Sequence, residues 1–167
     1  RPEDWPATVA AARAWQERLQ ALVELRPLPR PPRHIAGVDA AYEKEERRLY
    51  GAAVVLSWPD FEIVAAAGVS GPVPFPYIPG LLSFREAPIL LAAVRKLPQP
   101  PEVILVDGQG IAHPRQLGLA SHLGLLLGIP TIGCAKTRLW GEMAALAEEK
   151  GSFCPLTAAG KIVGWVL

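Results

Sequence analysis

The chain has 167 residues, of which half are apolar and a fifth are charged, and its formal net charge is +1. This length suits a single domain with a full apolar core, since domains commonly contain ~100–150 residues. The nearly neutral charge excludes a positive field over the whole protein, so nucleic-acid binding would require a local basic cluster. Two cysteines in no metal-ligand spacing exclude a disulfide framework.

The sequence also bears on where the protein works. No apolar stretch reaches the ~20 residues that a membrane span requires, and the N-terminus lacks the apolar core of a signal peptide. We therefore expect a soluble, cytoplasmic protein that makes no membrane contact and keeps both cysteines as free thiols.

The first 33 residues predict a helix and a linker. Apolar side chains recur at a spacing of three to four from residue 5 to about residue 23, which predicts an amphipathic helix that begins near Asp4. Residues 26–33 carry four prolines and predict an extended linker.

Three strand-like runs follow the linker, at residues 34–42, 49–57 and 62–70. The polar segments between them, 43–48 and 58–60, are short enough to be turns. Short connections of this kind predict consecutive antiparallel strands.

The pattern then changes to alternating helices and strands. Helical periodicity covers residues 81–96 and 116–127. The apolar run 103–106 predicts a strand buried on both faces, residues 131–135 predict another short buried strand, and 161–167 predict a last one. This order predicts an α/β fold in which helices flank a mixed sheet, as a single domain over residues 1–167.

Two aspartates interrupt apolar strands. Asp39 lies inside the first strand, where an unpaired buried carboxylate is costly; the alternative is a solvent-facing edge position or an early turn. Asp107 directly follows the strand at 103–106, and ligands gather outside the carboxyl ends of strands in open α/β sheets. The alternative for Asp107 is a helix N-cap, which the intervening residues 113–115 disfavour.

A third carboxylate has a strong structural alternative. Residues 83–86 form the capping-box pattern S-x-x-E, and periodicity alone favours Glu86 as part of a helix start. Together, Asp39, Glu86 and Asp107 would instead be a set of hard oxygen ligands suited to Mg²⁺ or Mn²⁺.

Loops around these carboxylates carry basic and aromatic side chains. Each basic residue alone is more often a solvated surface charge, but as a group they predict a rim that contacts phosphates: Arg85, His113, Arg115, Lys136 and Arg138. Prolines on both sides of Tyr77 fix the loop at 74–80. Its ring either packs on the domain or projects as a wedge between bases.

These motifs resemble the endonuclease V family of deoxyinosine-specific repair nucleases. The matching strings are IAGVD at 35–39, PYIPGLLSFRE at 76–86 and the long segment 106–142, within a resemblance that covers about residues 34–167. The resemblance implies a ribonuclease-H-like fold. It also implies cleavage of the second phosphodiester bond 3′ to a deoxyinosine in DNA, with inosine-containing RNA as a further expected substrate and a monomeric enzyme.

The resemblance also assigns roles to residues. It implies that Asp39, Glu86 and Asp107 bind Mg²⁺, with Mn²⁺ as a substitute, which overrides the capping-box interpretation of Glu86. Lys136 is then expected near the scissile phosphate. The residues expected to contact the substrate are the wedge Tyr77, the pocket glycines Gly80, Gly108 and Gly110, and His113 and Arg85.

One departure from the family pattern affects the expected activity. The family continues for several dozen residues with a Ser-x-Gly-His segment and a final helix, whereas this sequence stops at Leu167. The alternative function is therefore a module that binds inosine or distorted DNA but cleaves it weakly. A nuclease of the same fold with another substrate is disfavoured by the wedge loop.

Overall fold

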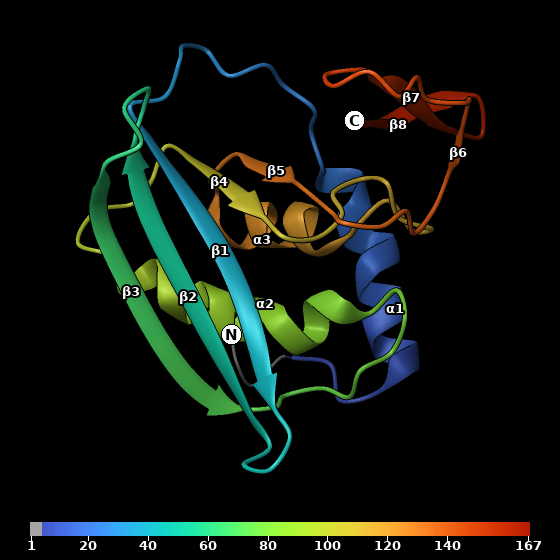
Figure 1. Ribbon diagram of the computed structural model, residues 1–167. Coiled ribbons are helices and arrows are strands. Elements are labelled where there is room, and N and C mark those ends of the chain that lie inside the picture. The colour runs from blue at the N-terminus through green and yellow to red at the C-terminus, as the bar shows by residue number, and fades with distance from the viewer. Residues whose placement is uncertain (1–4) are drawn as a thin grey trace.

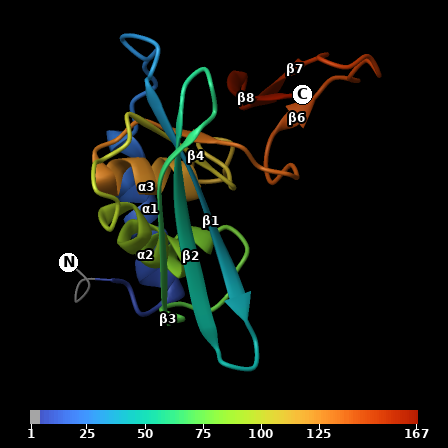
Figure 2. The same ribbon diagram turned by 60° about the vertical axis from the view of Figure 1, so that its left-hand side comes forward.

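The computed structural model describes residues 5–167 and contains a five-stranded sheet with three helices on one side (Figures 1 and 2). No helix in this described part of the chain is long and apolar enough to cross a membrane. The strands of this sheet are β1 (His34–Glu43), β2 (Arg48–Ser57), β3 (Ile63–Pro72), β4 (Val103–Val106) and β5 (Thr131–Gly133). The helices are α1 (Val9–Leu19), continued by a 3₁₀ turn (Gln20–Leu22), α2 (Leu82–Arg95) and α3 (Leu119–Leu127).

The strand order is β3-β2-β1-β4-β5. The first three strands pair antiparallel in sequence, as their short connections predict. β4 pairs parallel with β1, and β5 pairs parallel with β4. The predicted α/β class with a mixed sheet is therefore confirmed, and β1 lies at its centre.

Only one face of this sheet is covered in the described residues. Along β1, Ala36 and Val38 are buried, while Gly37 and Asp39 between them are exposed. The predictions that β4 is buried on both faces and that β5 is a buried strand are wrong: Leu105 is 37% exposed and Ile132 is 49% exposed. β4 is apolar throughout and β5 carries Ile132, but α2 and α3 pack on one face alone (Figure 2).

Helix starts differ from the predictions for local reasons. α1 begins at Val9, later than expected, because the side chain of Thr8 caps it by accepting a hydrogen bond from the backbone N of Ala11 at 3.2 Å. The expected start at Asp4 lies outside the described residues. α3 begins at Leu119, not residue 116, because Gln116 has a φ of 50°, which is incompatible with a right-handed helix.

A second, three-stranded sheet follows β5 and lies apart from the first sheet in both views (Figures 1 and 2). It contains β6 (Glu142–Met143), β7 (Cys154–Ala158) and β8 (Lys161–Val166), all antiparallel. The sequence predicted β8. It did not predict β6, which has two residues, or β7, which contains Pro155 and is too short for clear alternation.

The segment before α1 completes the hydrogen bonding of α2. Pro88 lies inside α2 and has no N–H, so the carbonyl four residues earlier, that of Phe84, lacks its helical donor. The indole Nε1 of Trp5 donates to this carbonyl at 2.8 Å. The same indole stacks on the buried ring of His122 in α3, with ring centroids 5.6 Å apart and planes at 7°. Trp5 therefore joins the N-terminal segment to two helices.

We expect Trp5→Phe to destabilise the protein by ~1–3 kcal/mol, because a partly buried carbonyl loses its donor. In a Pro88→Ala background, the new backbone N–H competes for the Phe84 carbonyl, so the cost should fall by ~1 kcal/mol. Urea unfolding of the four proteins measures the difference. Trp15→Phe, which changes a neighbouring aromatic contact of Phe84, should cost the same in both backgrounds. An equal cost of Trp5→Phe with and without Pro88 would contradict this explanation.

Candidate active site

Asp39 and Asp107 are brought together by the parallel pairing of β1 with β4. Val38 is paired with Val106, and each aspartate is the next residue along its strand. Neighbouring strands lie ~4.8 Å apart, so the two carboxylates start from adjacent backbone positions. Asp39 is exposed on the open face of a central strand, and Asp107 is partly buried. The prediction that these aspartates lie on neighbouring strands is confirmed, and Asp39 is not at a sheet edge.

Glu86 reaches this region from α2. The capping-box alternative is wrong, because α2 begins after Leu81 without a side-chain cap, and the Ser83 hydroxyl lies 3.0 Å from Nδ1 of His122 instead. Burial raises the pKa of Glu86 to about 7; the charges of Asp39 and Asp107 act in the same direction, and the neighbouring Arg85 opposes them. The three carboxylates therefore influence one another electrostatically.

Lys136 supplies a positive charge at the same place. It follows β5, its side chain is exposed, and its Nζ donates to Oδ2 of Asp107 at 2.5 Å. This hydrogen bond and the charge of Asp107 raise the pKa of Lys136, and Asp39 adds to the effect. The ammonium group is therefore bound to Asp107 and remains charged at neutral pH.

The three carboxylates do not form a closed metal-binding cluster in this structure. Across residues 5–167, no three His, Cys, Asp or Glu side chains lie close enough together to hold one ion. The expectation that Asp39, Glu86 and Asp107 bind a metal ion stays a prediction. The set nevertheless fits a divalent cation chemically, because three carboxylates supply the hard oxygen ligands that Mg²⁺ and Mn²⁺ prefer, and the charges of Asp39 and Asp107 add to burial in raising the pKa of Glu86.

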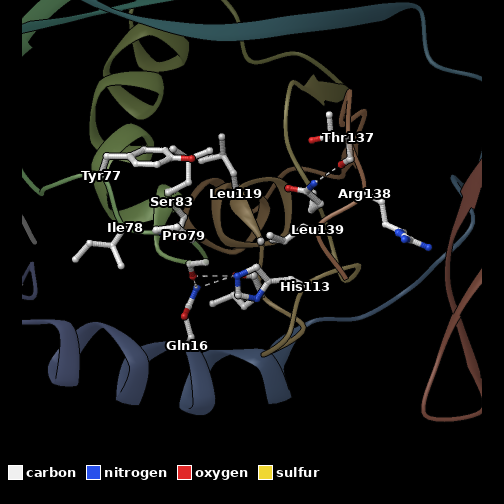
Figure 3. A pocket seen from close by; sticks show the side chains of 15 residues that line it. Gln16, Tyr77, Ile78, Pro79, Ser83, His113, Leu119, Thr137, Arg138 and Leu139 are labelled. Atoms are coloured by element: carbon white, nitrogen blue, oxygen red, sulfur yellow. Dashed lines mark hydrogen bonds between the residues drawn. The ribbon is translucent and has the colours of Figure 1, made fainter. Parts of the chain in front are cut away.

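A cavity of about 220 Å³ lies between α1, the loop 77–80 and the segments that follow β4 and β5 (Figure 3). One wall is the loop 77–80, the opposite wall comes from the segment after β4, and residues 137–139 close a third side. The walls include Tyr77, which is 67% exposed at the rim, and His113 and Leu119, which are buried.

The pocket glycines are only partly as expected. Gly80 lines the cavity and has a φ of +77°, which favours glycine, but Gly108 and Gly110 do not line it; Gln109 between them does. The closest approaches occur at two other glycines. A Cβ on Gly118 would lie 2.3 Å from the carbonyl oxygen of Gln109, and one on Gly133 would lie 2.4 Å from that of Gly108. Here the loop after β4 packs so tightly that a side chain has no room.

The carbonyl of Gly80 accepts three hydrogen bonds. Gln16 Nε2, His113 Nε2 and Arg115 Nη2 each donate to it at 2.9 Å. Nδ1 of His113 accepts from the backbone N of Arg115 at 3.1 Å, so its proton is on Nε2. Burial lowers the pKa of His113 to about 4, although the bond to Gly80 opposes this. His113 is therefore neutral at neutral pH and positions the loop.

The predicted basic rim is smaller than expected. Arg85 is only 8% exposed; its Nη1 donates to the Phe75 carbonyl at 3.3 Å, and its Cζ lies 4.4 Å from the centre of the Tyr42 ring. Arg85 and His113 are therefore buried, not exposed on a rim, and their contact with substrate stays a prediction. Lys136 and Arg138 remain exposed.

Two glutamines of the site were not assigned roles from the sequence. Gln109 donates from Nε2 to the Thr137 carbonyl at 2.9 Å and so joins two cavity walls. Gln16 is fully buried in α1. A signal for Gln16 exists: it occupies the inward spacing set by Val9 and Ala12, where an apolar residue is expected.

Comparisons with known proteins agree with this arrangement. Residues 17–167 match the family model Endonuclease V. Endonuclease V of Trichormus variabilis is 48% identical over 168 residues, which cover 100% of this chain and 76% of that protein. The crystal structure of endonuclease V from Streptomyces avermitilis matches with a TM-score of 0.92 at 47% identity, over 99% of this chain and 74% of that one.

A further match includes a nucleic acid. Ciona intestinalis endonuclease V, solved in complex with a 24mer DNA containing an inosine followed by a ribo-adenosine, has a TM-score of 0.71 at 29% identity. The match covers 86% of this chain and 62% of that one. Since the family model spans most of the chain and close relatives are almost half identical to it, this protein belongs to the endonuclease V family.

Proposed function

We propose that this protein is a metal-dependent endonuclease that hydrolyses the second phosphodiester bond 3′ to a deoxyinosine in DNA, and that it also accepts inosine-containing RNA. The observation that carries the proposal is that two of the loops lining the cavity also carry Asp107 and Lys136. Asp107 is two residues from the cavity residue Gln109, and Lys136 precedes the cavity residue Thr137. A base held in the cavity would therefore have its phosphates beside the carboxylates.

The cavity favours a single base as its ligand. Its volume is below the ~300–1,000 Å³ of sites for drug-sized molecules. Inosine differs from adenine because its six-position oxygen accepts a hydrogen bond, where the amino group of adenine donates one. Backbone N–H groups around Gly80 and Gln109 are the donors that we propose for this oxygen. The inosine-containing DNA of the Ciona relative supports this choice of substrate.

The carboxylates would hold the metal. Asp39, Asp107 and Glu86 would bind Mg²⁺, with Mn²⁺ as a substitute, and a bound ion lowers the pKa of a water and stabilises charge on the reacting oxygens. Binding requires Lys136 to release Oδ2 of Asp107, after which its ammonium group is free to contact a phosphate oxygen. Two positive charges then face the phosphates, from Lys136 and Arg138.

Tyr77 would separate the strands at the lesion. Its ring projects from a loop whose two ends are fixed, at Phe75 by Arg85 and at Gly80 by three donors. A rigid loop loses little conformational entropy when an aromatic ring is inserted between bases. This arrangement supports a wedge more strongly than ordinary loop packing.

A cleavage assay tests the proposal directly. Labelled duplexes with one inosine, or with adenine at the same position, are incubated with the protein and Mg²⁺, Mn²⁺ or a chelator. We expect a cut one nucleotide beyond the inosine with either metal, much slower cleavage of the adenine duplex, and no cut with the chelator. Selective binding without any cut would favour the alternative of a binding module. A parallel inosine-containing RNA tests the second substrate.

We expect Asp107→Asn to lower metal-dependent cleavage by more than about a hundredfold, the largest effect usually seen for residues that only support a metal ligand. Binding of inosine DNA, measured by gel shift without metal, should remain, because the cavity and Lys136 are retained. Asp60→Asn, an exposed acid in the β2–β3 turn, should change neither quantity. If Asp107→Asn retains parental cleavage, Asp107 is not a metal ligand.

We expect Tyr77→Ala to reduce the preference for inosine duplex over adenine duplex, since stacking contributes ~1–3 kcal/mol per base. Binding of undamaged DNA and its salt dependence should not change, because they depend on phosphate contacts. Phe61→Ala, which removes another exposed aromatic ring in the β2–β3 turn, is the matched control. An unchanged preference in Tyr77→Ala would mean that the ring only packs on its loop.

A further inference from the structure

Gln16 joins the two main walls of the cavity. Its Nε2 donates to the Gly80 carbonyl at 2.9 Å on one wall and to the Leu117 carbonyl at 3.1 Å on the other. Its Oε1 accepts a hydrogen bond from Nε of Arg115 at 2.5 Å. The side chain is 1% exposed, and Figure 3 shows it rising from α1 toward His113.

These three bonds give Gln16 a role that an apolar residue cannot fill. Without the amide, the Leu117 carbonyl loses a buried donor, and the guanidinium of Arg115 loses the acceptor that orients it toward Gly80. Buried polar groups without partners are unfavourable, so the two walls would move to find water or other partners. The spacing between the walls therefore depends in part on this side chain of α1, which acts together with the bonds of His113 and Arg115 to the Gly80 carbonyl.

We propose that Gln16 is a positioning residue that sets the width of the cavity and thereby its selectivity for inosine. The inference rests on the proposed function, because it concerns the same cavity. Hypoxanthine and adenine are similar in size, so a site that distinguishes them must hold its hydrogen-bond donors at fixed positions. Gln16 does not contact the reacting phosphate and acts through Gly80, Leu117 and Arg115.

The test compares the parent chain with Gln16→Met, which keeps a side chain of similar length but makes none of the three bonds. Ala14→Gly is the matched control. Ala14 is exposed in the middle of α1, so glycine destabilises the helix without changing either cavity wall. Two quantities are measured: the ratio of single-turnover cleavage rates on inosine and adenine duplexes, and backbone hydrogen exchange.

Hydrogen exchange reports the walls directly. The amide of Leu81 is bonded to the Ile78 carbonyl in one wall, and the amide of Gly118 is bonded to the Gly110 carbonyl in the other. We expect Gln16→Met to accelerate exchange at both amides by at least about fivefold, the ratio that one lost hydrogen bond corresponds to. The inosine-to-adenine ratio should fall by a similar factor, and Ala14→Gly should change neither quantity.

The outcomes separate this inference from the proposed function. A parent that does not prefer inosine would refute the function, while hydrogen exchange would still decide whether Gln16 holds the walls. A selective parent with an equally selective Gln16→Met variant, or equal exchange at both amides, would overturn the inference. If Gln16→Met does not fold, Gln16→Glu replaces it. Glutamate keeps the acceptor for Arg115 but loses both donors, so the same two effects are expected.

Discussion

The parallel pairing of β1 with β4 is the constraint on which the site depends. It aligns Val38 with Val106 and so places Asp39 beside Asp107. In the sequence, β2, β3 and α2 lie between these two strands. The segment after β4 begins with Asp107 and therefore starts beside Asp39. The same segment forms a cavity wall. A shift of one residue in this register would turn one aspartate to the covered face of the sheet.

Buried polar side chains then fix the backbone of the loop between β3 and α2. Arg85 holds the Phe75 carbonyl, while Gln16, His113 and Arg115 hold that of Gly80. Each of these groups looks like a candidate for substrate contact when it is considered by residue type alone. In the structure, their hydrogen bonds are used to position the backbone, and the exposed charges that remain are Lys136 and Arg138.

Periodicity and motif spacing predicted the strand order of the hairpins, the helices and the neighbouring aspartates. Other features depend on contacts that a linear pattern does not contain. An apolar strand such as β4 has the same pattern whether one or two layers cover it, and Leu105 shows that one does. Gly118 and Gly133 require glycine because the backbone of residues 108–110 passes directly against both of them. Gln16 bonds residues 64 and 101 positions away, so only its unusual place on the apolar side of α1 was visible in the sequence.

The contact between Trp5 and the Phe84 carbonyl has a consequence for biosynthesis. The two residues are 79 positions apart, and the stacking partner His122 is further still along the chain. The ribosome therefore releases Trp5 well before either partner exists, and its indole ring must stay in solvent or in a chaperone until α2 and α3 have been made. Contacts between distant positions also form slowly after synthesis, because closing the intervening loop costs chain entropy. The segment that is translated early is thus among the last to reach its native position.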